Sequence, residues 1–185
     1  MPHRAFIGLG TNLGDRPANY RQAIQRIGQL PETRIVRHSS IYETEPVGDI
    51  EGVFLNGVVE LETEIPVEVL MRRLLAIERA MGRKRSTKRK RSAAPRKYRA
   101  RIIDLDLLFY DKEIVHTPPL TVPHPRLHER RFVLAPMAEL APALIHPELN
   151  VSISELLAGL KSPQRVTLAR ADLLRPASTR EVLTR

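Results

Sequence analysis

The chain of 185 residues contains no cysteine. Disulfide bonds, zinc–thiolate centres and catalysis by a thiol are therefore excluded. The apolar stretch within residues 1–14 is too short for a signal peptide, and no run approaches the length of a membrane-spanning helix. These absences, together with the length, predict a cytoplasmic protein with one main domain and no membrane partner.

Acidic residues are missing from one segment, 83–101, which holds eleven of the 30 Lys and Arg residues. The 19 basic residues outside it face 21 Asp and Glu, so the rest of the chain is slightly acidic although the formal net charge is +9. A basic excess confined to one loop argues against a broad nucleic-acid-binding face. It indicates a local site for a polyanion.

Two common phosphate-binding motifs are missing as well. No G-x-x-x-x-G-K-[ST] sequence occurs, which excludes a P-loop. Gly8-x-Gly10 weakly resembles a dinucleotide fingerprint, but the spacing to Gly14 is wrong and no acidic residue closes the next strand.

Arginines of the basic segment are the better phosphate candidates, because guanidinium groups bind phosphate oxygens bidentately and stay charged at any working pH. They are Arg83, Arg85, Arg99 and Arg101. We interpret the run at 88–91 as a solvated stretch, and the whole segment 83–101 as a mobile loop that serves as a lid.

Hydrophobic periodicity predicts a β-α-β-β-α-β order. Strands are expected at 3–9, 34–42, 53–61 and 101–110, with helices beginning after Asp15 and at Pro66. This order favours a ferredoxin-like α+β fold, in which an antiparallel sheet has both helices on one face and leaves the other face free for the active site.

The strand at 101–110 carries two carboxylates on one face. Alternation places Ile103, Leu105, Leu107 and Phe109 on one side, and Asp104, Asp106, Leu108 and Tyr110 on the other. The two carboxylates are then about 7 Å apart at the backbone, and such like charges repel unless a cation lies between them. A pair of Mg²⁺ ions would satisfy this geometry and would also hold a polyphosphate. The alternative is that both aspartates simply face water.

Three further side chains are candidates with an ordinary alternative. Asn56, beside Phe54 on the same open face, offers a planar amide to a heterocycle or is structural. His124, between two prolines, contacts a phosphate or caps its turn. Glu78, on the second helix, is functional or an ordinary exposed acid.

The C-terminal part has weaker patterns. Helices are expected near 136–140 and at 154–160, the second capped by Ser154, and the apolar pattern fades beyond residue 161. We therefore expect a domain at 1–160 and a loosely attached tail at 161–185.

Seven motifs occur here in the order found in the 6-hydroxymethyl-7,8-dihydropterin pyrophosphokinase (HPPK) family. They are 8–15 (GLGTNLGD), 42–48 (YETEPVG), 54–56 (FLN), 77–83 (IERAMGR), 101–106 (RIIDLD), 120–126 (LTVPHPR) and 130–134 (RRFVL). The chain strongly resembles this family from about residue 5 to about residue 147.

The resemblance implies a monomeric folate-biosynthesis enzyme that moves the terminal diphosphate of ATP to the hydroxymethyl group of the pterin and releases AMP. It implies two Mg²⁺ ions on Asp104 and Asp106, with Arg85 and Arg101 stabilising charge during transfer. The pterin would be bound by Thr44, Val47, Phe54, Asn56 and Phe132. ATP would be bound by Glu78, Arg83, Arg85, Tyr98, Arg101, Leu107, His124 and Arg130.

The chain departs from the family pattern in three places. The loop between Arg85 and Arg101 is longer and more basic than usual. Tyr98 stands where some members have a tryptophan. The segment after Lys161 has no identified counterpart.

An RNA-binding domain and a pseudoenzyme are the two alternative functions. A ferredoxin-like RNA-binding domain would stack bases on aromatic residues of its central strands, where this chain has Phe54 alone and no RNP-like run. Salt-dependent RNA binding without ATP turnover would favour it. A pseudoenzyme whose long loop no longer closes would bind ATP and pterin without reaction in a single-turnover assay.

Overall fold

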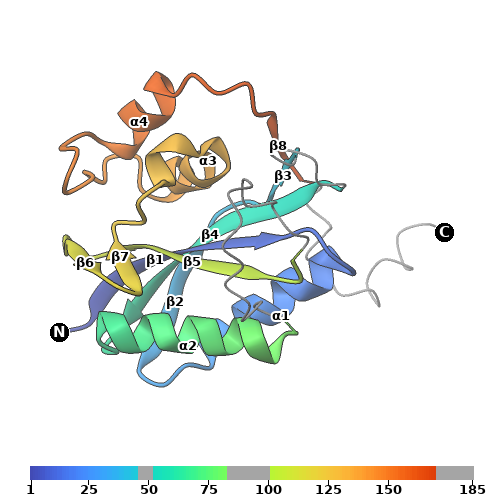
Figure 1. Ribbon diagram of the computed structural model, residues 1–185, viewed down its shortest axis with the longest axis vertical. Coiled ribbons are helices and arrows are strands. Elements are labelled where there is room, and N and C mark those ends of the chain that lie inside the picture. The colour runs from blue at the N-terminus through green and yellow to red at the C-terminus, as the bar shows by residue number, and fades with distance from the viewer. Residues whose placement is uncertain (46–51, 83–100, 170–185) are drawn as a thin grey trace, which may run out of the picture.

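The computed structural model describes residues 1–45, 52–82 and 101–169, and within them one antiparallel sheet organises the molecule (Figure 1). Its strands are β1 (His3–Thr11), β2 (Thr33–His38), β3 (Tyr42–Thr44), β4 (Phe54–Thr63), β5 (Asp104–Tyr110) and β8 (Val166–Leu168). The helices are α1 (Arg16–Gly28), α2 (Val67–Ala80), α3 (Arg131–Leu140) and α4 (Ile153–Gly159), with a 3₁₀ turn at Leu127–Glu129. A separate hairpin joins β6 (Val115–Thr117) to β7 (Leu120–Val122).

The sheet has the order β5-β1-β4-β3-β8, and β2 also pairs with β4. The predicted single strand at 34–42 is therefore wrong, because β2 and β3 pair with different parts of β4. The break lies at Ser39, whose hydroxyl accepts a hydrogen bond from the N–H of Val58 at 3.0 Å. A serine side chain that competes with the backbone for such a bond interrupts the regular ladder.

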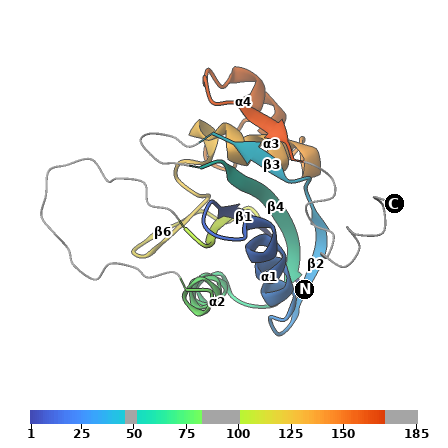
Figure 2. The same cartoon turned by 90° about the vertical axis from the view of Figure 1, so that its right-hand side faces the viewer.

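Helices α1 and α2 cover one face of the sheet, as predicted (Figure 2). Asp15 caps α1, because its carboxylate accepts a hydrogen bond from the N–H of Ala18 at 2.9 Å. In α2 the predicted apolar stripe is buried against the sheet. It consists of Val67, Leu70, Leu74, Ile77 and Met81. The α+β architecture with an antiparallel sheet is thus confirmed.

The opposite face is not left free along its whole length. Helices α3 and α4 lie over part of it (Figure 2), where they form a second core with Phe6 of β1, Val58 of β4 and Leu108 of β5. The prediction of a free face is wrong for this part, since the C-terminal helices have apolar sides that require a partner. The uncovered remainder is where the candidate site lies.

A β-bulge in β5 changes which residues face which layer. Phe6 pairs with Phe109 and Ile7 with Leu107, so Leu108 is an extra residue in the ladder. The bulge inverts the alternation beyond it. Phe109 consequently packs with α3 and α4, and Tyr110 packs with α1 and α2, the reverse of the prediction for both residues.

The C-terminal segment differs from expectation at two points. Ser152, rather than Ser154, caps α4, and it forms a capping box with Glu155. Beyond residue 160 the chain returns to the sheet, where β8 pairs with β3. Residues 166–169 are thus attached along a sheet edge, and residues 170–185 lie outside the described part. Within the described ranges, no helix is both long enough and apolar enough to cross a membrane.

Candidate active site

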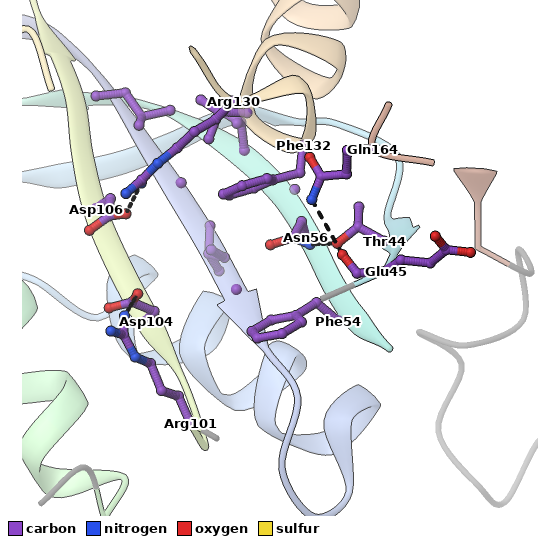
Figure 3. Close-up of a pocket in the computed structure, with 17 residues that line it drawn as sticks. Thr44, Glu45, Phe54, Asn56, Arg101, Asp104, Asp106, Arg130, Phe132 and Gln164 are labelled. Carbon is purple, nitrogen blue, oxygen red and sulfur yellow. Dashed lines mark hydrogen bonds and ion pairs between the residues drawn. The ribbon is translucent and has the colours of Figure 1, made fainter. Parts of the chain in front are cut away.

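A pocket lies on the sheet face opposite α1 and α2, beside α3 (Figure 3). Its floor is β1, where Gly10 lies in register between Asn56 of β4 and Asp104 of β5, and Gly8 lies next to Asp106. Residues two apart on a strand face the same side, so these glycines leave a hollow between the carboxylates and Asn56. Gly8 and Gly10 thus leave space in the floor of the pocket, and they do not form part of a dinucleotide fingerprint.

Two aromatic rings form opposite walls of the pocket. Phe54 begins β4 and Phe132 lies in the first turn of α3, and Figure 3 shows their rings on either side of Asn56. The buried Asn56 amide donates through Nδ2 to Oγ1 of Thr44 at 2.7 Å. Its Oδ1 faces Gly10, where a Cβ atom would lie 3.0 Å away. A flat heterocycle with N–H donors fits this slot.

Asp104 and Asp106 lie at the other end of the pocket (Figure 3). Arg101 forms an ion pair with Asp104, and Nη1 of Arg130 lies 3.3 Å from Oδ2 of Asp106. Burial, and then the Asp104 carboxylate, raise the pKa of Asp106, although His124 and the two arginines act to lower it. The repulsion between the two carboxylates that their spacing predicted is therefore present in the folded chain.

His124 lies beside this carboxylate end. Its Nδ1 accepts a hydrogen bond from the N–H of Arg126 at 3.2 Å, and its Nε2 lies 3.8 Å from Oδ2 of Asp106. Burial lowers the pKa of His124 despite the nearby Asp106. The ring caps its turn through one nitrogen while the other lies near Asp106, so a capping role and a contact with phosphate are compatible.

Glu78 is fully buried, which excludes the alternative of an exposed acid. Its Oε1 accepts a hydrogen bond from the N–H of Leu105 at 2.9 Å. Because β5 is an edge strand of the described sheet, Glu78 takes the place of a neighbouring strand at this N–H group. The N–H of Leu107 points toward the same edge by alternation, which is where the predicted backbone contact with ATP would form.

Asn12, which no sequence pattern marks as a site residue, fixes the chain where it enters β5. The N–H of Asn12 donates to the carbonyl of Arg101 at 3.1 Å, and the N–H of Arg101 donates to Oδ1 of Asn12 at 2.7 Å. These two bonds hold the Arg101 backbone, so its side chain starts from a fixed point beside Asp104. The sequence contains no local signal of this contact, because the partners are 89 residues apart.

Several predicted site residues lie outside the described residues. They are Val47, Arg83, Arg85, Tyr98 and Arg99, together with the basic run at 88–91. Their roles stay predictions. Eight of the predicted residues that the structure describes line the pocket. Figure 3 shows them in two groups: Thr44, Phe54, Asn56 and Phe132 at one end, and Arg101, Asp104, Asp106 and Arg130 at the other.

The carboxylate end has donors that suit Mg²⁺. Asp104 and Asp106 supply hard oxygen ligands from one face of β5, and a cation between them would relieve their repulsion. In nucleotide sites Mg²⁺ takes one or two carboxylates and fills its remaining positions with phosphate oxygens and water. The residues present therefore fit the predicted metal.

An aromatic slot that ends at two carboxylates and two guanidinium groups is typical of a nucleotide-dependent transferase. A model of the 7,8-dihydro-6-hydroxymethylpterin-pyrophosphokinase (HPPK) family matches residues 6–142. The chain belongs to this family, as the seven sequence motifs predicted.

Two bacterial relatives carry the name 2-amino-4-hydroxy-6-hydroxymethyldihydropteridine pyrophosphokinase. The Bacillus subtilis protein is 40% identical over 141 residues, which are 76% of this chain and 79% of that protein. The Methylorubrum extorquens protein is 38% identical over 143 residues, which are 77% of this chain and 85% of that protein.

A similar solved structure is that of Plasmodium falciparum HPPK-DHPS A437G with SDX-DHP. It has a TM-score of 0.66 and 15% sequence identity, and the match covers 85% of this chain. The match covers 45% of that chain, so the present chain spans less than half the length of this protein. At this identity the likeness shows the fold alone.

Proposed function

We propose that this chain transfers the terminal diphosphate of ATP to the hydroxymethyl group of 6-hydroxymethyl-7,8-dihydropterin, as a pyrophosphokinase of folate biosynthesis. The observation that carries the proposal is the pocket itself, in which a slot between Phe54 and Phe132 leads directly to the carboxylates of Asp104 and Asp106. The family membership supports the same reaction.

The pterin binds at the aromatic end of the pocket. Stacking between Phe54 and Phe132 holds the flat ring, and Oδ1 of Asn56 accepts from ring N–H groups. The Thr44 hydroxyl fixes the Asn56 amide through the 2.7 Å hydrogen bond, so the acceptor is already oriented before substrate binds.

The triphosphate of ATP lies at the charged end. Two Mg²⁺ ions, with Asp104 and Asp106 among their ligands, would neutralise phosphate charge and activate the attacking hydroxyl when bound. Arg101 and Arg130 exchange their present carboxylate partners for phosphate oxygens and stabilise the charge that develops during transfer. Arg83, Arg85 and Tyr98 contribute further contacts to ATP, as do Glu78, His124 and the backbone at Leu107.

Other parts of the proposal concern the molecule as a whole. The sheet and its two layers support a ferredoxin-like topology, with β2 and β3 together taking the place of one strand. We expect the enzyme to be a monomer, as the family resemblance implies. We expect it to work in the cytoplasm. We expect no nucleic-acid partner, because the basic excess of the sequence lies in the one segment 83–101.

The test is to mix the purified protein with ATP, Mg²⁺ and 6-hydroxymethyl-7,8-dihydropterin and to analyse the products. AMP should appear one-for-one with a pterin diphosphate. ADP as the product would contradict the diphosphate transfer. Binding of both ligands in a single-turnover experiment without reaction would identify a pseudoenzyme. RNA binding without any ATP turnover would replace the proposal by the RNA-binding alternative.

A side chain at Gly10 should block the pterin slot. The Cβ of a Gly10→Val variant would lie 3.0 Å from Oδ1 of Asn56, and its methyl groups would extend into the pocket. We expect pterin affinity to fall about ten- to a hundredfold, whereas ATP affinity should change much less. Calorimetric titration with each ligand measures both. Gly159→Ala is the control, because a Cβ there meets nothing within 4 Å.

A further inference from the structure

The segment beyond α4 extends along the pterin end of the pocket. It is held at its start, where Arg131 donates to the carbonyl of Leu160 at 3.1 Å. It is held again at β8, which pairs antiparallel with β3 from Val166 opposite Thr44 to Leu168 opposite Tyr42. Between these two points the chain passes along the pocket, which Gln164 lines.

The passing chain presents alternate residues to the protein. Ser162, Gln164 and Val166 are half-buried, whereas Pro163 and Arg165 are exposed. An extended chain with this period has one inward side, and Gln164 is the member of that side that lines the pocket. The attachment at both ends thus places a glutamine amide at the wall of the slot.

The Gln164 side chain lies between Phe132 and Glu45, the residue that follows β3 by one position (Figure 3). Its Nε2 donates to the carbonyl of Glu45 at 3.3 Å. Figure 3 shows the amide pointing toward Phe132 and Thr44, over the end of the slot that is remote from the aspartates. Within the described part of the chain, its Oε1 accepts no hydrogen bond.

We propose that Gln164 is a pterin-binding residue of this enzyme, supplied by the C-terminal segment 161–169. Its amide donates to the Glu45 carbonyl and thereby fixes its own orientation, and its Oε1 accepts a hydrogen bond from an N–H group of the pterin pyrimidine ring. The inference rests on the proposed function, since it names a further contact for the pterin in that pocket. The C-terminal segment is then part of the substrate site and not a tail.

A glutamine suits this position for a physical reason. The pyrimidine edge of a pterin has N–H donors, and a buried donor left unpaired costs affinity. Asn56 offers one acceptor from the floor, and Gln164 offers a second from the wall, on a side chain held by its own hydrogen bond. Because Gln164 is distant from the carboxylate end, its contribution belongs to pterin binding and not to ATP binding.

The test compares Gln164→Ala and Gln164→Met with the full-length wild-type chain. Titrations with 6-hydroxymethyl-7,8-dihydropterin and with ATP, steady-state KM values for both substrates, kcat and Tm are measured for each protein. Loss of the hydrogen bond should weaken pterin binding and raise the pterin KM about tenfold in both variants. The ATP KM and Tm should stay near the wild-type values. Thr167→Ala is the matched control, because Thr167 is exposed on the same segment.

Three outcomes would overturn the inference. Unchanged pterin affinity in Gln164→Ala would remove the contact altogether. Wild-type affinity in Gln164→Met, which keeps the volume without the amide, would show packing and no hydrogen bond. Equal losses for pterin and ATP with a lowered Tm would show a structural role of the segment. Absence of pterin binding by the wild-type chain would instead refute the proposed function, so the two failures are distinguishable.

Discussion

Asp104→Ala and Asp106→Ala should each abolish turnover, with kcat falling at least about 10³-fold. Either change removes carboxylate oxygens that we propose as ligands of Mg²⁺, at the place where the triphosphate would bind. The fold should persist, because both side chains lie at the pocket surface, outside the two cores. In Asp104→Ala the pKa of Asp106 should stay raised by burial, but the smaller contribution from the Asp104 carboxylate is lost.

The measurement is the rate of AMP formation over a range of Mg²⁺ concentrations, together with Tm. Asp104→Asn separates charge from shape, since it keeps the size of the side chain. Glu62→Ala is the control for a carboxylate in an ion pair elsewhere on the sheet, where it faces Arg34. Near-normal rates in limiting Mg²⁺ for either aspartate variant would contradict the metal assignment.

Arg101→Ala should lower kcat about 10³-fold, the range found for an arginine that stabilises charge in phosphoryl transfer. The change should remove the guanidinium group without moving the backbone. Asn12 binds the backbone N–H and carbonyl of Arg101, so the strand remains anchored when the side chain is removed. Pterin affinity should change little, because Arg101 lies at the carboxylate end of the pocket. Single-turnover kinetics with saturating ATP measure the loss.

The basic loop provides the comparison for this variant. Arg85→Ala should have an effect similar to that of Arg101→Ala, whereas deletion of residues 88–91 should cost much less. Arg101→Lys keeps the charge without the bidentate fork and should recover part of the rate. A deletion of 88–91 that is as harmful as Arg101→Ala would show that the extra basic run takes part in catalysis.

The sequence predicted the parts of the fold that depend on local periodicity. The stripe of α2, the cap at Asp15 and the alternation that directs Asp104 and Asp106 to one face all follow from residues close together in the chain. Asn56 and Phe54 followed from the same rule applied to a second strand. The family motifs then gave Arg130 and Phe132, which no local pattern assigned to the pocket.

The features that the sequence did not predict depend on contacts between residues that are far apart in the sequence. Ser39 breaks a strand because Val58 lies opposite it. Asn12, which directly follows β1, anchors Arg101 beside it, although the two are 89 residues apart in sequence, and Gln164 reaches the pocket because β8 pairs with β3. Contacts between residues far apart in the sequence produce no repeating pattern in the neighbouring residues, so an analysis of hydrophobic periodicity does not reveal them.

The extra residue in β5 has a consequence for how this strand tolerates change. Asp104 and Asp106 of this strand line the pocket, whereas Leu108 and Phe109 pack with α3 and α4, and Tyr110 packs with α1 and α2. Insertion or deletion of one residue between Asp106 and Phe109 would exchange the faces of everything beyond it, and would turn an aromatic ring away from the helices that pack on it. Substitutions in this stretch alter single contacts, whereas its length is fixed by two layers at once. The number of residues between Asp106 and Phe109 must therefore stay the same, because Asp106 has to face the pocket while Phe109 has to pack with α3 and α4.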